Sequence, residues 1–208
     1  MQNTSTTLND CIVAWSGGVE STALLHQLVL EGRNPLVFHI QCYVNNKQAN
    51  LFETHAVEQM AESYFNLDVH YIDVVLPCVK PARTSLFWRG KSYGRGVPFM
   101  PIVSSTAFNL QIFHPWIKEI YSGANALEFQ WDKPEYALRN KYYNDLSKIY
   151  GCEVKYINGH LGHLDKKEQW LMIPEEMRQW VRSCTAPQSE PCGTCTKCKE
   201  REKFIDKS

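Results

Sequence analysis

The amino-acid sequence predicts an α/β fold of three layers, with a parallel sheet at its centre and a cysteine-rich appendage at its C-terminal end. Short apolar segments alternate with amphipathic segments along most of the chain, and this alternation is typical of a parallel sheet covered by helices on both faces. Half of the eight cysteines lie between positions 184 and 198, where a metal site would explain them. We therefore expect residues 1–183 to form the α/β domain and residues 184–208 to form the appendage.

The expected strands are short apolar runs, rich in Val, Ile, Phe or Tyr and bounded by polar residues or Gly. They span residues 11–15, 36–42, 69–74, 119–122 and 154–157. Segments with apolar residues at helical spacing separate the strands, and they predict helices at residues 21–30, 51–64, 101–113, 135–150 and 168–180. The Gly-rich and basic segment 87–98 interrupts this pattern and is expected to be a mobile loop.

The charges of the chain are balanced, with 22 basic and 22 acidic residues. No global field attracts nucleic acid or an anionic membrane, and we expect neither as a partner. The sequence has no run of about 20 apolar residues for a membrane span, and residues 1–10 lack the basic-then-apolar layout of a secretion signal. We therefore expect a cytoplasmic protein, in which cysteines stay reduced.

The first candidate site lies at the junction of the first expected strand and helix, at residues 15–22. Gly17 and Gly18 allow a sharp turn and a close approach of the backbone to a ligand. The helix that follows offers N–H groups and the positive end of its dipole, which together predict a phosphate site. Ser16 and Ser21 add hydroxyl donors, and a carboxylate at Glu20 would bind Mg²⁺, which bridges phosphate oxygens.

An ordinary strand–turn–helix junction is the alternative, with Ser or Glu as the cap of the helix. The loop is neither the GxxxxGK[ST] nor the GxGxxG phosphate loop, because no Lys follows the glycines and their spacing differs. The composition of this junction alone leaves both interpretations open.

The second candidate site is formed by Cys184, Cys192, Cys195 and Cys198, with the spacing C-x7-C-x2-C-x2-C. A C-x2-C turn directs two sulfurs at one centre, and four thiolates suit a closed tetrahedral zinc site that is structural. A disulfide pair is one alternative, which a reducing compartment disfavours. An iron–sulfur cluster is the other, although C-x2-C-x2-C clusters usually continue with x3-C-P.

Taken in order, these motifs resemble a known group of enzymes. The run SGGVES at 16–21 is similar to the SGGxDS pyrophosphate loop of the N-type ATP pyrophosphatases, with Glu20 in place of the usual Asp. Together with PCGTCTKC at 191–198 and LDKKEQW at 164–170, this run resembles the 7-cyano-7-deazaguanine synthase branch of these enzymes over about the whole chain. Gly123 lies where that family has a glycine at the end of a strand.

The resemblance implies the adenine nucleotide alpha hydrolase-like fold and an ATP-dependent carbon–nitrogen ligase of queuosine biosynthesis. Such an enzyme adenylates 7-carboxy-7-deazaguanine, and ammonia then displaces AMP to give an amide. A second activation dehydrates the amide to the nitrile, preQ0. ATP, Mg²⁺ and Zn²⁺ are the implied cofactors, and a homodimer is the implied assembly.

The same resemblance assigns roles to individual residues. The implied catalytic residues are Ser16, Glu20 and Lys166. The implied ATP-binding residues are Trp15, Ser16, Gly17, Gly18, Val19, Glu20, Ser21, Thr22 and Gly123. The segment VPFMP at 97–101 lacks the Arg and Asn of the family's V-P-G-R-N segment. Two alternatives therefore stay open, namely a PP-loop ATPase that acts on another acceptor (a modified deazapurine, nucleic acid or protein) and a nucleotide-binding subunit without catalytic activity.

Overall fold

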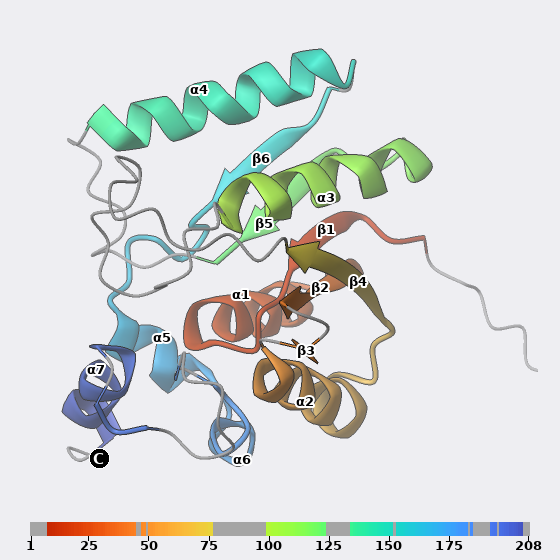
Figure 1. Cartoon of the computed structure of the whole chain (residues 1–208). Helices are drawn as coiled ribbons and strands as arrows, with labels where there is room; N and C mark the ends of the chain where they lie inside the picture. Colours follow the sequence, from red (N-terminus) through yellow and green to blue (C-terminus); the bar gives the residue numbers. More distant parts are fainter. Residues whose placement is uncertain are drawn as a thin grey trace, which may run out of the picture.

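A computed structural model of the chain (Figure 1) describes residues 8–44, 47–48, 50–76, 99–123, 134–151, 153–182, 184, 192–194 and 196–205. The strands are β1 (Cys11–Ala14), β2 (Pro35–Val44), β3 (Lys47–Gln48), β4 (Val69–Leu76), β5 (Glu119–Ser122) and β6 (Lys155–Asn158). The helices are α1 (Val19–Leu30), α2 (Leu51–Met60), the π-helical turn η1 (Ala61–Phe65), α3 (Phe99–Phe113), α4 (Pro134–Ile149), α5 (Lys166–Met172), α6 (Glu175–Arg178) and α7 (Thr196–Ile205).

The long strands form one parallel sheet, as the sequence predicts. β1 lies at its centre and pairs with β2 on one side and with β5 on the other, and β4 and β6 follow outward. The two-residue strand β3 pairs antiparallel with the end of β2 at Tyr43 and Val44. The parallel sheet that the sequence predicts is confirmed, and β3 is an antiparallel addition whose two residues are too few to give a periodic pattern.

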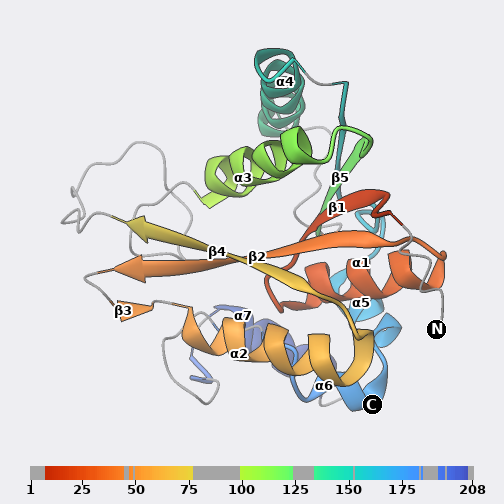
Figure 2. The same cartoon turned by 90° about the vertical axis from the view of Figure 1, so that its right-hand side faces the viewer.

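Helices cover both faces of the sheet, so the three-layer architecture is confirmed (Figure 2). Side chains of adjacent strand residues point to opposite faces. Val13 of β1 belongs to the core under α1, α2, α5 and α6, whereas its neighbour Ile12 belongs to the core under α3 and α4. Within the described residues, no helix has the length and apolar character needed to cross a membrane.

Helices α5 and α6 differ most from the expectation, and the helix expected at 51–64 is divided between α2 and η1. The helix expected at 168–180 is two helices, because Ile173 precedes Pro174 and has an extended backbone with ψ 129°. A residue before proline is disfavoured in the helical region, so α5 ends there. The N-terminus of α5 lies earlier than expected, since Asp165 and Glu168 form a capping box that starts the helix at Lys166. The loop expected at 87–98 lies outside the described residues.

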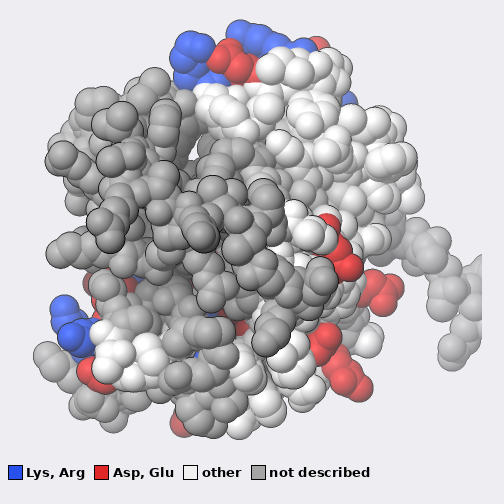
Figure 3. Space-filling view, viewed as in Figure 1, with Lys and Arg blue, Asp and Glu red and all other residues white. Residues whose placement is uncertain are grey.

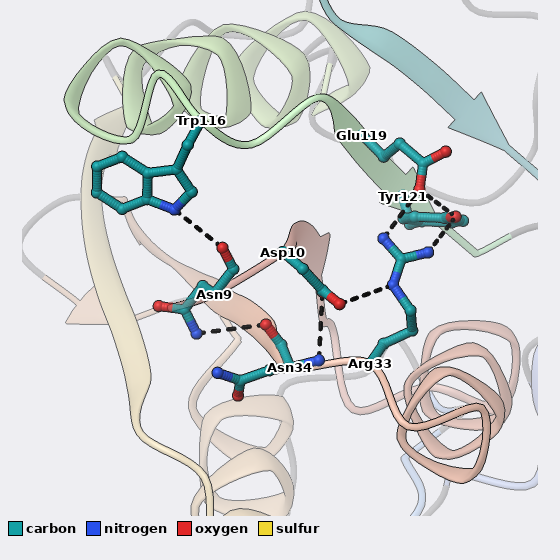
Figure 4. Close-up of polar contacts among 7 residues, drawn as sticks. All are labelled: Asn9, Asp10, Arg33, Asn34, Trp116, Glu119 and Tyr121. Carbon is teal, nitrogen blue, oxygen red and sulfur yellow. Dashed lines mark hydrogen bonds and ion pairs between the residues drawn. The ribbon is translucent and has the colours of Figure 1, made fainter. Parts of the chain in front are cut away.

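At the amino ends of the strands, Arg33 ties three segments together (Figure 4). Its guanidinium donates to Asp10 before β1 and to Glu119 at the start of β5, both at 2.9 Å. It also donates to the Tyr121 hydroxyl at 3.2 Å, and that hydroxyl donates to Glu119 at 2.9 Å. Burial, followed by the Glu119 contact, raises the pKa of Tyr121 to about 12, which keeps the hydroxyl protonated.

Charged side chains are spread unevenly on the outer surface. In the view of Figure 3, Lys and Arg side chains lie over α4 and α7 with acidic side chains among them, and further Asp and Glu side chains lie on the side of α2 and β4. Among the described residues this view shows no continuous basic surface, in keeping with the even charge balance of the chain.

Candidate functional site

The loop between β1 and α1 lies at the point where the order of the strands reverses. From β1 the chain builds the sheet first toward β2 and β4, and later toward β5 and β6 on the other side. In open parallel sheets, ligands bind at the carboxyl ends of the strands at such a switch point. The carboxyl ends that meet here are those of β1 and β5, which place the loop at 15–18 beside Ser122 and Gly123.

Gly17 makes the sharp turn of the loop. Its φ is +75°, a left-handed conformation that residues with a side chain rarely adopt. A Cβ at Gly17 would lie 3.2 Å from the Glu53 carbonyl oxygen and 3.2 Å from Val57 Cγ2, so the loop is packed tightly on α2. From the other side, the Arg182 N–H donates to the Gly17 carbonyl at 2.8 Å. The turn is thus held in place by elements that are far apart in the sequence.

Gly123 comes closer still to the loop. A Cβ at this position would lie 2.6 Å from the Glu20 carbonyl carbon and 2.6 Å from the Ser21 backbone nitrogen. Because both atoms belong to the backbone of the first turn of α1, no side-chain movement would relieve the contact. The structure therefore brings Gly123 together with the loop, and it gives a reason for glycine there that is independent of any ligand.

Hydroxyl groups organise the interior of the loop. Ser16 Oγ lies 3.0 Å from Ser21 Oγ and accepts from the Gly18 N–H at 3.3 Å. Ser21 Oγ also accepts from the Ser16 N–H at 3.2 Å. No side chain caps α1 at Gly18, which leaves the start of the helix open to an anionic ligand. Ser16 is exposed, so its hydroxyl is also reachable from solvent.

Besides Ser21, three of the predicted ATP-binding residues have buried side chains. Trp15, Val19 and Thr22 are at most 2% exposed, and the Trp15 indole donates to Thr22 Oγ1 at 3.0 Å. His39 Nδ1 donates to the Trp15 carbonyl at 2.8 Å, and its Nε2 lies 2.9 Å from Thr54 Oγ1. These side chains form the base on which the loop rests, so a role for Trp15, Val19 or Thr22 toward ATP would fall to their backbone atoms.

Lys166 meets the loop at Glu20. Its ammonium lies 2.8 Å from Glu20 Oε1, and the two side chains are only 11% and 13% exposed. On its other side it lies 3.4 Å from Glu200 Oε2 in α7. The other oxygen of Glu20, Oε2, is the one directed toward Gly18. The predicted catalytic residues Ser16, Glu20 and Lys166 therefore belong to one continuous site.

Sequence reasoning missed two residues of this site. Arg182 packs against Gly17 and Gly18 through its backbone, and its guanidinium lies over the Phe52 ring at 5.4 Å. Glu200 joins Lys166 across 34 positions of the chain. Neither residue has a motif of its own, although both lie close in sequence to the cysteines at 184 and 198.

Three of the four predicted metal ligands converge. The sulfurs of Cys184, Cys192 and Cys198 all lie within 4.8 Å of one another, and those of Cys192 and Cys198 are 3.9 Å apart. Ligands of one tetrahedral zinc ion with Zn–S bonds of about 2.3 Å are separated by about 3.8 Å, so this spacing fits a single ion. Cys195, the fourth predicted ligand, lies outside the described residues.

Helix α7, which carries Cys198, packs on α5. Arg201 in α7 lies over the Trp170 ring at 5.4 Å, while Glu200 contacts Lys166 at the start of the same helix α5. Burial lowers the pKa of the Arg201 guanidinium. These contacts join the candidate metal site to the residues around the loop.

No family model and no curated protein matches this chain. Among the solved structures that match is the U34-tRNA thiolase NcsA from Methanococcus maripaludis with its 4Fe-4S cluster, at 16% sequence identity and a TM-score of 0.46. The match covers 95% of this chain and 65% of that chain, so this chain spans about two thirds of the length of that structure. Proteins that share an α/β architecture differ widely in activity, so function has to be argued from the site.

Proposed function

We propose that this chain is an ATP-dependent ligase of the PP-loop type, which holds the phosphates of ATP at the loop from Ser16 to Ser21. The observation that carries the proposal is the uncapped start of α1 at the switch point of the sheet, which the close approach of Gly123 to the backbone of Glu20 and Ser21 holds in place. This contact joins the carboxyl end of β5 to the first turn of α1 at the switch point of the sheet, where the uncapped helix is suited to an anion.

Each part of the loop has a chemical task in this proposal. Backbone N–H groups and the Ser16 hydroxyl would stabilise the charge that builds on pyrophosphate as it leaves. Glu20 supplies a carboxylate for Mg²⁺, which neutralises phosphate charge when it is bound. Lys166 supplies a mobile positive charge next to the same carboxylate. The arrangement suits transfer of AMP to an acceptor with release of pyrophosphate.

The acceptor that we propose is the carboxylate of 7-carboxy-7-deazaguanine. Its oxygen would attack the α-phosphorus of ATP, pyrophosphate would leave, and ammonia would then displace AMP to give the amide. A second activation and loss of the amide oxygen would give the nitrile preQ0. This assignment rests on the resemblance of the loop, the LDKKEQW segment and the cysteine segment to 7-cyano-7-deazaguanine synthases.

Zinc is the metal that we propose for Cys184, Cys192, Cys195 and Cys198. The short separations of the three described sulfurs favour one shared ion. In a four-iron cluster each thiolate binds a different iron, which would hold the sulfurs farther apart. A site filled by four cysteines leaves no open position, so the ion would be structural.

The test is a mass-spectrometric assay of the purified protein with ATP, Mg²⁺, ammonium and 7-carboxy-7-deazaguanine. The proposal predicts preQ0 and AMP, with the amide as an intermediate. If AMP is released only with a different acceptor, the proposed substrate is wrong and the proposed adenylation chemistry stands. Absence of AMP with every acceptor would refute the ligase.

One observation favours a second candidate, a nucleotide-binding subunit without turnover. The carboxylate proposed for Mg²⁺ is already paired with Lys166 at 2.8 Å, and it belongs to Glu rather than to the usual Asp of the loop. Under this alternative ATP binds without release of AMP, and Glu20→Asp restores AMP release. Wild-type activity in the same assay would eliminate this candidate.

A further inference from the structure

Lys166 is shared by two carboxylates that come from different parts of the fold. Glu20 lies in the first turn of α1, whereas Glu200 lies in α7, two residues after Cys198. The distances from the Lys166 ammonium are unequal, 2.8 Å to Glu20 and 3.4 Å to Glu200. The environments are unequal as well, since the Glu20 side chain is 13% exposed and that of Glu200 is 42% exposed.

Mg²⁺ bound at the loop would weaken the ion pair between Glu20 and Lys166. The oxygen of Glu20 that faces Gly18 is Oε2, while Oε1 is held by Lys166. A divalent cation on this carboxylate would repel the neighbouring ammonium, and such repulsion is strong in a site that is largely removed from water. A second anionic partner for Lys166, in addition to the phosphates of ATP, would lower the cost of this repulsion.

Glu200 is in the right place to be that partner. A lysine ammonium is a compact charge with three donors on a flexible stem, so it can move between two acceptors that are close together. Glu200 is kept in position by its own helix, which Arg201 anchors on Trp170 and which the cysteine cluster anchors through Cys198. At 3.4 Å from the Lys166 ammonium, Glu200 is placed to receive it.

We propose that Glu200 is a positioning residue that shares Lys166 with Glu20 and so weakens the Lys166–Glu20 pair with which Mg²⁺ competes when ATP binds. This inference rests on the proposed function of the loop and deepens it. It concerns the metal dependence of nucleotide binding, and it assigns a role to a residue outside the loop, outside the cysteine ligands and outside the motifs that carry the family resemblance.

The first arm of the test needs no nucleotide. The free energy of unfolding is measured for Glu20→Gln, Glu200→Gln and the double variant, as a double-mutant cycle. If both carboxylates share Lys166, the double variant loses more stability than the sum of the single variants, because Lys166 loses both of these partners. Glu202→Gln is the matched control, since Glu202 is exposed on the same helix, and its effect should add to that of Glu20→Gln. If the losses of unfolding free energy in Glu20→Gln and Glu200→Gln add up to that of the double variant, the proposal is overturned.

The second arm follows ATP binding by calorimetry at increasing Mg²⁺. In Glu200→Gln we expect the Mg²⁺ concentration for half-maximal binding to rise about threefold to fivefold, in line with the loss of a partly exposed ion pair. Binding of ATP without Mg²⁺ should not weaken, because only a negative charge is removed. An unchanged Mg²⁺ dependence in Glu200→Gln would overturn the proposal. Failure of the wild-type protein to bind ATP at all would instead refute the proposed function, and the stability cycle would still decide whether Glu200 shares Lys166.

Discussion

Two ion-pair triads with the same pattern of charges lie at opposite ends of the sheet. At the amino ends of the strands, Arg33 lies between Asp10 and Glu119 (Figure 4). At the carboxyl ends, Lys166 lies between Glu20 and Glu200. Each triad has one cation and two carboxylates, yet the first has equal contacts of 2.9 Å and the second has unequal contacts of 2.8 and 3.4 Å.

The difference follows from the chemistry of the two cations. The Arg33 guanidinium is a planar fork whose donors are fixed in direction, and Asp10, Glu119 and the Tyr121 hydroxyl occupy three of its nitrogens. A lysine ammonium has no such plane and can be shared or transferred. The Arg33 triad therefore stabilises the fold, whereas the Lys166 triad is suited to change when a ligand arrives at the loop.

The largest effect is expected from Cys198→Ser, which should remove the metal and release α7. The sulfur of Cys198 is one of three that converge, and an ion with one ligand lost is bound far more weakly. Metal content measured by inductively coupled plasma mass spectrometry should fall from about one ion per chain to nearly none. Cys42→Ser is the control, because Cys42 is buried far from the cluster in β2. Cys198→Ser with full metal content would contradict the assignment of this ligand.

Lys166→Met should have the next largest effect, since it removes the ammonium and keeps the length of the side chain. Glu20 would then be a carboxylate of low exposure without this partner, and breaking such a pair costs about 3 kcal/mol of unfolding free energy. Urea denaturation measures the loss. Lys167→Met, at an exposed neighbouring position, should change the stability little. Equal losses in the two variants would show that the Lys166 contacts add nothing.

Gly123→Ala tests the close approach of β5 to the loop. The added methyl group would lie 2.6 Å from backbone atoms of Glu20 and Ser21, so we expect an overpacking cost of about 1–3 kcal/mol and weaker ATP binding. Gly32→Ala is the matched control. Gly32 has a φ of +78° but open space around its Cβ position, so its substitution should lower stability and leave ATP binding unchanged. Weaker binding in both variants would point to general destabilisation.

The smallest effect is expected from Arg33→Met, in the triad that we regard as structural. Burial acts to raise the pKa of Glu119, but the hydrogen bonds from Arg33 and Tyr121 and the charge of Arg33 together lower it below 4.5. The stabilisation from this carboxylate is therefore present above about pH 4.5 and is lost as the pH falls through the lowered pKa of the folded state. We expect Arg33→Met to cost about 1–2 kcal/mol at pH 7.

The pH series supplies the check on that prediction. The difference in unfolding free energy between wild type and Arg33→Met should shrink as the pH falls below 4.5, because Glu119 becomes protonated in both proteins. ATP binding at pH 7 should be the same in both. If Arg33→Met loses ATP binding, the Arg33 triad does more than stabilise the fold, which would contradict the distinction between the two triads.

Local features of the fold were readable from the sequence, whereas its long-range contacts were not. The strand expected at 119–122 has the same bounds in the structure, because a short run with β-branched and aromatic residues is a local signal. The pairing of Ile12 with Ile120 joins residues that are far apart in the chain, and no local pattern encodes it. The break at Pro174 was readable, since proline restricts the residue before it, but the apolar spacing of 168–180 outweighed it in the prediction.

In the candidate site, too, local features could be predicted from the sequence and long-range contacts could not. The glycines and serines of the loop follow from its own sequence, because a turn and a helix start need those residue types. Gly123, Lys166 and the four metal ligands were predicted from motif spacing and resemblance, and the structure places Gly123 and Lys166 at the loop. The contact between Lys166 and Glu200 depends on how α7 packs on α5, which the sequence of neither helix specifies.

The most direct test of the account is calorimetric titration of the wild-type protein and Gly123→Ala with ATP in the presence of Mg²⁺. We expect saturable one-to-one binding to the wild type and clearly weaker binding to Gly123→Ala, with Gly32→Ala equal to the wild type. Absence of binding to the correctly folded, metal-loaded wild type would contradict the claim that the loop from Ser16 to Ser21 is a phosphate site.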